Sequence, residues 1–584
     1  MEELHSSDEF VKDGSVDLHG QSVIRVQTGT WKASLFIIGV ELAERFAYAG
    51  ISSNLIIYLT SVLNESTATA ASNVNMWSGV QYILPFLGAF VADSYLGRYW
   101  TIIAASLVYL IGLILVTLSA SLGSLKPSVC KYKSESCSRL RSSQFKIVFF
   151  FFSLYLIALG SGGHKPSLQA FGADQFDDEN PKEKQHKISF FNWWYFGICL
   201  GTLAGVTVLV YIQDNIGWGV GYGIPAATMA MSILVFLCGT RFYRNKLPGG
   251  SPLTRVIHVF VATFYKRNAP IPFREQNQLA SIQEEEVLTE SRRQLLLTNE
   301  FRFLDKATIE DELDFECKTA RNWRLCTAQQ VEEVKLLLGM LPIWMACLMY
   351  GVVFAQSSTF FTKQGSTMDR KIGRHFVIPS ASMQCFISIS IILLVPVYDR
   401  IFVPVAKRLS GNERGITLLQ RIGTGMFISA ISMIVAAGIE IKRVKAAMDS
   451  GLIDVPSATI PMSIFWLLPQ YVLFGIADVF TMVGMQEYFY DQMPDTMKSL
   501  GIAVYLSVIG VGSFLSSILI LVIEKATCGK QEHCWFANNL NRSHLSYFYW
   551  LLASLSLFNL GIFMTLASCY KYKKTASTDT ENAT

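Results

Sequence analysis

Long apolar stretches separated by polar connections dominate this sequence. Stretches of the length that a helix needs to cross a bilayer fall into two sets of six. The first set covers about residues 34–62, 74–95, 99–121, 145–163, 190–212 and 218–240, and the second about residues 336–361, 380–400, 416–440, 460–488, 499–523 and 546–568. The pattern therefore predicts an all-α membrane protein with twelve transmembrane helices in two six-helix halves.

Polar segments flank and separate the two halves. We expect a cytosolic N-terminal tail over residues 1–31, six-helix bundles over 32–241 and 336–569, a long cytosolic central loop over 242–335 and a cytosolic C-terminal tail over 570–584. An even number of spans places both tails on one side, and loops on the opposite side hold features typical of a lumenal or extracellular face. These features are two candidate glycosylation acceptors and two candidate disulfides: Asn64, Asn541, Cys130 with Cys137, and Cys528 with Cys534.

Composition supports the membrane class and argues against several others. The 584 residues are 51% hydrophobic and only 16% charged, whereas soluble domains carry about 25% charged residues. A net charge of +4 does not indicate a nucleic-acid partner. The sequence has no phosphate-binding glycine loop, no nucleophile motif and no paired spacing of metal ligands, so we expect neither an enzyme nor a cofactor. Without a phosphate-binding loop the chain is not expected to use ATP, so any transport would take its energy from an ion gradient.

Charged residues interrupt the first apolar stretch. Glu41, Glu44, Arg45 and Tyr48 follow offsets of three and four, which place them on one face of a helix. Each charge at the centre of a bilayer costs roughly 2.5–3.5 kcal/mol, so such residues persist where they face partners or a polar cavity. The pattern favours ion-coupled transport, and the alternative is a structural ion pair that locks two helices together.

A second intramembrane charge lies at the predicted end of the fourth helix. Residues 160–166 read GSGGHKP, in which small residues allow close helix approach and the proline bends the chain. Lys165 needs a carboxylate partner at this depth, and Glu41 or Glu44 would serve. A Lys–Glu pair that opens on protonation would provide a two-state element. The alternative is that Lys165 extends to the membrane surface.

The connection after the second helix carries an acid, a glycine and a base. Asp93 and Arg98 can pair across the helix ends, which suggests a role in gating or in structure. Arg98 also precedes Thr101 in a loose kinase pattern, which would make a regulatory kinase a partner. The alternative for Thr101 is a cap at the start of the helix.

These motifs together resemble a known family. Residues 41–50, ELAERFAYAG, resemble the E-x-x-E-R-F-x-Y-Y-G motif of proton-coupled oligopeptide transporters, and residues 88–98 resemble the G-x-x-x-D-x-x-G-R signature of major facilitators. Residues 171–177, 190–195, 301–307 and 331–335 resemble the plant nitrate/peptide transporter branch, and details resemble its subfamily with vacuolar nitrate carriers. The resemblance spans residues 30–570. It implies a major facilitator fold with a substrate site between the halves, and proton coupling by Glu41, Glu44, Arg45 and Lys165.

The resemblance leaves the cargo open. Tyr48 and Phe354 would line the pocket, Gln356 would bind cargo or hold helices together, and Asp478 stands where peptide carriers use glutamate to meet an amino group. Asp478 favours cationic or zwitterionic cargo, or it is a structural acid at the pocket edge. Ala49 replaces the motif's second tyrosine, which weakens a peptide assignment. Some nitrate-carrying relatives have a histidine at the position of Phe354, so a histidine-based anion site is excluded there.

We therefore predict a proton-coupled secondary transporter of a small polar solute, with nitrate as the first candidate. The alternatives are a transporter of di- or tripeptides, a hormone or a specialised metabolite and, in another class, a membrane sensor that binds cargo without moving it. Its partners would be protons, the solute and the lipid bilayer. We expect a multi-pass protein of the vacuolar or plasma membrane.

Overall fold

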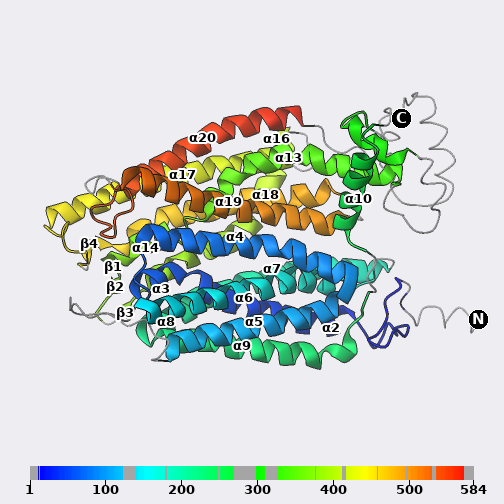
Figure 1. Ribbon diagram of the computed structural model, residues 1–584, viewed down its shortest axis with the longest axis horizontal. Helices are drawn as coiled ribbons and strands as arrows, with labels where there is room; N and C mark the ends of the chain where they lie inside the picture. Colours follow the sequence, from blue (N-terminus) through cyan, green and yellow to red (C-terminus); the bar gives the residue numbers. More distant parts are fainter. Residues whose placement is uncertain are drawn as a thin grey trace, which may run out of the picture.

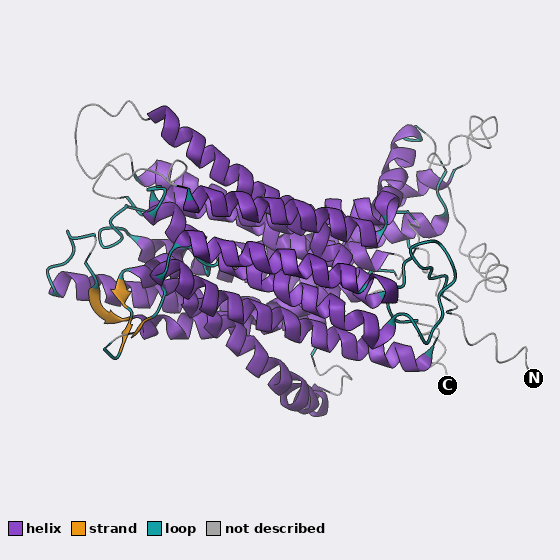
Figure 2. Cartoon of the chain, turned by 90° about the horizontal axis from the view of Figure 1, so that it is seen from below, coloured by secondary structure: helices purple, strands orange, loops and turns teal. Residues whose placement is uncertain are grey.

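The computed structural model describes residues 11, 13–122, 140–177, 180–246, 250–268, 298–309, 325–374, 376–410, 416–456, 458–494, 497–528 and 534–570. Its long helices run side by side along one axis (Figure 1). The start of α2 (Thr30–Ser52) and the finish of α20 (Leu545–Cys569) lie at the same end of this axis, which we call the terminal end. The other end carries the described strands and is called the strand end (Figure 2).

The N-terminal half runs from α2 to α9. After α2 its elements are α3 (Leu55–Ser61), α4 (Thr67–Val91) with the π-helical turn η1 (Ala92–Leu96), α5 (Arg98–Ser121), α6 (Leu140–Ala173), α7 (Pro181–Ala204) continuing through η2 (Gly205–Leu209) into α8 (Val210–Asn215), and α9 (Trp218–Cys238). Three short elements then lead to the other half: η3 (Thr240–Phe242), α10 (Pro252–Tyr265) and η4 (Arg302–Thr308).

The C-terminal half runs from α13 to α20. Its helices before α20 are α13 (Ala328–Phe354), α14 (Phe360–Ser366), η5 (Ser380–Gln384) with α15 (Cys385–Val397), η6 (Tyr398–Phe402) and α16 (Val403–Ser410), α17 (Leu418–Asp449), η7 (Ile464–Leu467) with α18 (Leu468–Asp491), and α19 (Lys498–Thr527). At the strand end, β1 (Met368–Asp369) pairs in parallel with β4 (Ile460–Ser463), and β2 (Lys371–Ile372) pairs antiparallel with β3 (Phe376–Val377).

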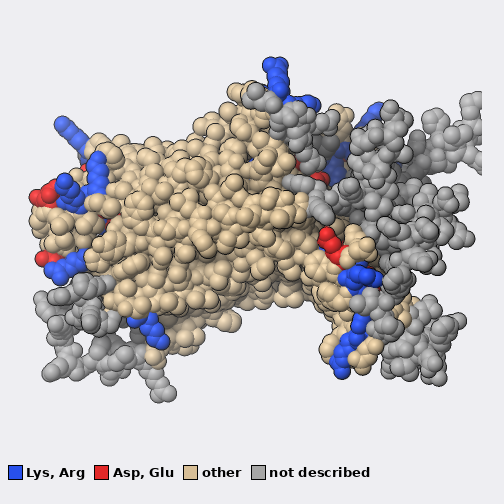
Figure 3. Space-filling model, turned by 90° about the horizontal axis from the view of Figure 1, so that it is seen from above, with Lys and Arg blue, Asp and Glu red and all other residues tan. Residues whose placement is uncertain are grey.

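Eleven of the described helical segments are long and apolar enough to cross a membrane. α2 is the twelfth long segment. Every 18-residue window of α2 contains Glu41, Glu44 and Arg45, whereas each of the eleven other segments has an apolar 18-residue window with at most two charged residues. On the face shown in Figure 3, charged side chains gather near the two ends and the middle belt is uncharged. The predicted all-helical membrane fold is confirmed.

Several predicted helix boundaries are wrong, and two of them show the physical reason. The stretch 34–62 does not form one helix, because α2 stops at Ser52 and α3 begins at Leu55. Asn54 lies in the break and its side-chain amide donates to Gln213 and Asp214, each at 3.1 Å. The helix predicted to stop near Pro166 continues to Ala173, and Pro166 lies inside it. Transmembrane helices tolerate an internal proline where neighbouring helices pack around it.

The two halves meet along α4 and α19. Small and polar residues allow this close approach: Ser72 and Ser517 share a hydrogen bond of 2.5 Å, and Asn75 donates to Ser516 at 3.0 Å. At the strand end the halves are joined again, because Lys363 of α14 donates to Thr60 of α3 at 3.0 Å. Figure 1 shows the two halves as lower and upper groups of helices.

Candidate functional site

The first charged group lies on one face of α2. Glu41 and Glu44 are 2% and 0% exposed. The Arg45 guanidinium reaches both carboxylates, with Nε 2.6 Å from Glu41 Oε1 and 3.0 Å from Glu44 Oε2. Oε2 of Glu41 accepts no hydrogen bond from the described residues. Oε2 of Glu44 accepts none either, because its contact with Arg45 is an ion pair without the geometry of a hydrogen bond. The structure therefore brings these three predicted residues together and leaves part of their hydrogen-bonding capacity unused.

Lys165 approaches this group from α6. Its Nζ lies 4.0 Å from Glu44 Oε1, and a shorter contact of 3.0 Å joins it to Gln81 Oε1 on α4. It also lies 4.0 Å from the centre of the Tyr48 ring. The predicted Lys165–Glu44 pair is thus present only at the distance limit of an ion pair. Sequence reasoning missed Gln81, because no local pattern connects a glutamine on α4 to a lysine on α6.

Aromatic residues connect this group to the other half. The Tyr48 ring stacks on Trp77 with centroids 6.1 Å apart, and Tyr82 of α4 meets Phe354 of α13 edge-to-face at 6.4 Å. Phe354 also contacts Phe474 of α18 at 5.9 Å. Phe354 therefore lies where α4, α13 and α18 meet, as a residue lining the space between the halves would.

Asp478 is the acid that the C-terminal half contributes. It lies buried on α18 and accepts a hydrogen bond from the hydroxyl of Tyr350, which is one helical turn before Phe354 on α13. Within the described parts of the chain, no ion pair joins Asp478 to a cation. Tyr350 was not predicted, although its offset of four from Phe354 places both on one face of α13.

Gln356 lies buried just after α13. It is fully buried and donates to Val352 O at 2.8 Å and to Ser516 Oγ at 3.1 Å. Its contacts are those of the alternative, a residue that holds α13 and α19 together. Its Oε1 accepts no hydrogen bond from the described residues, and binding of cargo by Gln356 stays a prediction.

At the terminal end, the predicted pair of Asp93 and Arg98 is part of a longer chain of charges. Arg98 lies 3.5 Å from Asp93 and makes a closer contact with Asp174, which follows α6. Lys246 then lies 3.7 Å from Asp174 and 3.4 Å from Asp13. Asp174 and Lys246 were missed as partners of this pair, and Asp13 ties the segment before α2 to it.

Two predicted modification sites conflict with the structure. Thr101 is 5% exposed and its hydroxyl donates to Gly97 O at 2.8 Å, so a kinase cannot reach it in this fold, nor does it cap the helix. Asn541 is 3% exposed; its Oδ1 accepts from Arg443 at 2.8 Å and its Nδ2 donates to Leu452 O at 3.3 Å. A glycan has no room there. Asn64 is exposed in the loop after α3.

The predicted cysteine pairs lie at the strand end or outside the described residues. A disulfide joins Cys528 and Cys534, just after α19. Cys130 and Cys137 lie outside the described residues. Among the described residues, no group of His, Cys, Asp or Glu side chains has the arrangement of a metal site.

Comparisons with known proteins are consistent with this arrangement. The profile of the POT family matches residues 99–536. The chain is 50% identical over 564 residues to the Arabidopsis thaliana protein NRT1/ PTR FAMILY 5.10, with 96% of both chains covered. It is 44% identical over 572 residues to Protein NRT1/ PTR FAMILY 8.1 of the same plant, with 98% of this chain and 99% of the relative covered.

Solved structures show the same fold at lower identity. A crystal structure of an auto-inhibited POT family peptide transporter superposes with a TM-score of 0.68 at 24% identity, covering 92% of this chain and 97% of that one. The POT family transporter PepTSo gives a TM-score of 0.67 at 21% identity, covering 92% and 98%. The chain therefore belongs to the POT family, and it is a proton-coupled secondary transporter of the multi-pass membrane type, not an enzyme.

Proposed function

We propose that this transporter moves a small anion together with a proton, and that nitrate is the first anion to test. The observation that carries the proposal is the position of Lys165. Its ammonium group lies 3.0 Å from Gln81 Oε1, closer than any carboxylate among the described residues, while the centre of the Tyr48 ring and Glu44 Oε1 both lie 4.0 Å away. A cation at membrane depth whose closest partner is neutral, and whose acid partner is at the distance limit of an ion pair, is suited to receive an anion.

Charge balance gives this cluster a means of coupling. Glu41, Glu44, Arg45 and Lys165 sum to zero when both acids are ionised. Arg45 lies within ion-pair distance of both acids, so a proton on Glu44 leaves the group with one excess positive charge beside Lys165. An anion bound there restores neutrality. Because uncompensated charge is costly at this depth, proton and anion binding strengthen one another.

Protonation of Glu44 and binding of the anion can also drive alternating access. Protonation of Glu44 weakens its attraction to Lys165 of α6, so α2 and α6 are freer to move relative to one another. The seam of α4 and α19 and the Lys363–Thr60 contact would then open and close around the loaded site. We assign Arg98, with Asp93 and Asp174, to the gate at the terminal end, which we place in the cytosol.

A second candidate cargo has an amino group, as in a di- or tripeptide. Asp478 favours it, because this buried carboxyl group has a hydrogen-bond donor in Tyr350 and no cationic partner among the described residues. An ammonium group of the cargo would supply the missing positive charge. A hormone or specialised metabolite with a similar group would fit equally.

Tracer flux separates these cargoes. Oocytes expressing the chain, with delivery to the surface verified, would be offered nitrate and a dipeptide separately at acid and neutral pH. Acid-stimulated nitrate flux without dipeptide flux supports the anion proposal. Dipeptide flux alone would overturn it and assign Asp478 to the amino group, and binding without any flux would indicate a sensor. We propose the vacuolar or plasma membrane as the site of action, which a fluorescent fusion in plant cells would test.

A further inference from the structure

α10, the helix between the two halves, has apolar residues on two opposite faces. One face packs into the protein: Val256, Val259 and Ala262 are buried in one cluster with Val331 and Val334 of α13. The opposite face carries Ile257, Phe260 and Phe264, which are 49%, 40% and 63% exposed. Their offsets of three and four form a continuous stripe. Such a stripe in water would be costly, so it marks a contact surface.

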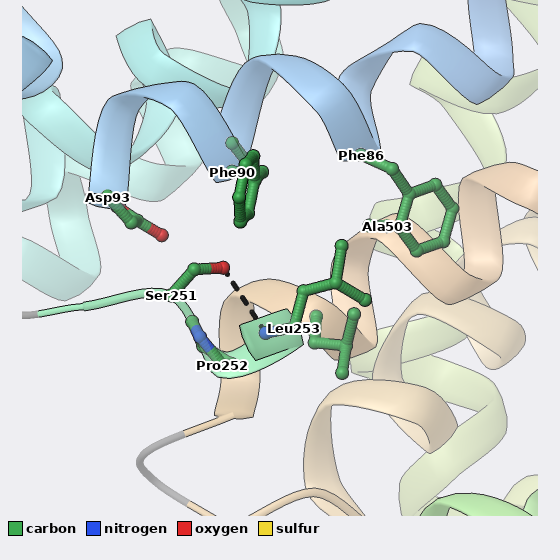
Figure 4. Close-up of a pocket in the computed structure, with 9 residues that line it drawn as sticks. Phe86, Phe90, Asp93, Ser251, Pro252, Leu253 and Ala503 are labelled. Atoms are coloured by element: carbon green, nitrogen blue, oxygen red, sulfur yellow. Dashed lines mark hydrogen bonds between the residues drawn. The ribbon is translucent and has the colours of Figure 1, made fainter. Parts of the chain in front are cut away.

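The depth of α10 matches the surface of the bilayer. Its first residues, Ser251 to Leu253, line a small pocket together with Asp93 and Leu500 (Figure 4). Asp93 lies in the last turn of the span Thr67–Leu96, and Leu500 begins the span Leu500–Thr527. α10 therefore starts at the level where the apolar spans finish. These spans have 30 and 28 residues, more than the roughly 20 that cross the hydrocarbon core, so we place their last turns at the terminal end in the headgroup layer.

The direction of α10 suits a helix that lies in this boundary. In Figure 1 it runs across the common axis of the long helices, at the terminal end. Helices that lie in the plane of a membrane bury an apolar face rich in Leu and Phe among the lipids and keep basic residues near the headgroups. Arg267 fits this pattern, because it follows the stripe and lies over the Phe264 ring at 5.0 Å.

We propose that the Ile257–Phe260–Phe264 face of α10 docks in the interfacial layer of the lipid bilayer and anchors the connection between the halves there. Depth, direction and side-chain chemistry all favour lipid over a soluble protein as the occupant. A soluble partner would have to bind within the headgroup layer, where phospholipid is already present at high concentration.

The anchor acts beside the proposed gate. Pro252 and Leu253 line a crevice between the two halves (Figure 4). The N-terminal half contributes Phe86 and Phe90 of α4 to this crevice, and the C-terminal half contributes Ala503 of α19. A helix held in the bilayer surface at its outer face keeps its first turn in this crevice. The lipid contact would therefore influence how far α4 and α19 separate at the terminal end.

Photolabelling of the unmodified protein tests the proposal. The full chain would be reconstituted in liposomes containing phosphatidylcholine with a diazirine on its acyl chain, and labelled peptides would be mapped by mass spectrometry. Label is expected on Ile257, Phe260 or Phe264. Met345, which is exposed on the span α13, serves as the positive control, and Phe376, exposed on β3 at the strand end, as the negative control.

A paired variant sharpens the result. Phe260→Ser with Phe264→Ser is expected to reduce label on α10 about tenfold or more, because each buried phenyl group contributes a large part of the lipid affinity. Label at Met345 should stay unchanged. Unlabelled α10 in the native protein, with Met345 labelled normally, would overturn the proposal and indicate that another protein or another segment covers the stripe. Label on α10 that survives the double substitution would also overturn it.

Discussion

Two buried charge groups, one in each half, differ in how completely they are satisfied. In the C-terminal half, Glu440 and Arg443 of α17 are fully buried and joined by contacts of 2.6 and 2.8 Å. Gln364 donates to Glu440 at 2.8 Å, and Arg443 donates to Asn541 and to Leu540 O. In the N-terminal half, Glu41 and Glu44 share one arginine, and each keeps an oxygen that accepts no hydrogen bond from the described residues.

We infer from this difference that the Glu440–Arg443 pair is structural and that the α2 group takes part in proton coupling. Each charge of the Glu440–Arg443 pair is matched, so a change in its protonation would only cost stability. The α2 group has two acids around one arginine, with Lys165 at the distance limit, so its charges can be rearranged by a proton or an anion. The two acids that share one arginine, with Lys165 at the distance limit, are the reason that we propose a functional role for the α2 group.

The largest effect should come from breaking the satisfied pair. Arg443→Met leaves Glu440 buried without its cation, which costs about 3–5 kcal/mol. We expect little folded protein, measured as the monodisperse fraction in detergent and as a lower melting temperature. The double variant with Glu440→Gln should recover much of the loss. If the single variant folds normally but does not transport, the assignment of this pair as structural is wrong.

The next effect concerns the unsatisfied group. Glu44→Gln removes the proton site while the shape is kept, so proton-driven accumulation should fall to the level of passive exchange. The melting temperature should change little, because Glu41 still pairs with Arg45 at 2.6 Å. Flux in proteoliposomes with an imposed pH gradient is the measurement. Glu487→Gln, a carboxyl change at the partly exposed partner of Arg421, is the matched control.

A smaller effect is expected at Lys165. Lys165→Gln removes the cation proposed to receive the anion, and a hydrogen bond to a charged group is worth about 1.5–3 kcal/mol, so nitrate affinity should fall about tenfold to a hundredfold. Lys165→Arg should retain most of it. Calorimetric titration at acid pH gives both values. Unchanged affinity in Lys165→Gln would show that the anion binds elsewhere.

The charge chain at the terminal end should respond less. Asp174 makes a closer contact with Arg98 than Asp93 does at 3.5 Å, so Asp174→Asn should slow transport more than Asp93→Asn. Initial rates at saturating substrate provide the comparison, with surface expression as the control. The reverse order would contradict the assignment of Asp174 as the principal gate partner.

The smallest effect should be at Asp13. Burial alone would raise its pKa, but Ser15 and Lys246 hold the pKa below the ordinary value of 3.8. A lowered pKa adds stability above that ordinary value, and the stability is lost as pH falls through the lowered pKa. Because its cationic partner Lys246 has a partly exposed side chain, Asp13→Asn should lower stability by only about 0–1 kcal/mol near neutral pH. Thermal unfolding of both proteins at neutral and strongly acid pH measures this difference, which should vanish in acid.

Sequence patterns predicted the fold and the location of the α2 group, because both depend on the spacing of residues that are near one another in the chain. Apolar length defines the spans, and offsets of three and four define the face of Glu41, Glu44 and Arg45. Contacts between distant segments were not accessible in this way. The break at Asn54 depends on Gln213 and Asp214, and the true neighbour of Lys165 is Gln81 on another helix.

Modification motifs failed for a related reason. A sequon or a kinase pattern describes a few neighbouring residues and contains no information on burial. The side chain of Asn541 accepts a hydrogen bond from Arg443, and the hydroxyl of Thr101 donates to the carbonyl group of Gly97. Both side chains are buried in the folded chain, and neither motif contains that information.

The central claim is that binding of a proton and binding of an anion strengthen one another at the α2 group. Proton uptake on nitrate binding tests this claim most directly. Calorimetric titration of the purified protein with nitrate, in buffers of different ionisation enthalpy, yields the number of protons taken up per anion bound. Our account predicts net proton uptake and tighter binding at lower pH in the native protein, and pH-independent binding without uptake in Glu44→Gln. Nitrate binding without proton uptake in the native protein, or unchanged uptake in Glu44→Gln, would contradict it.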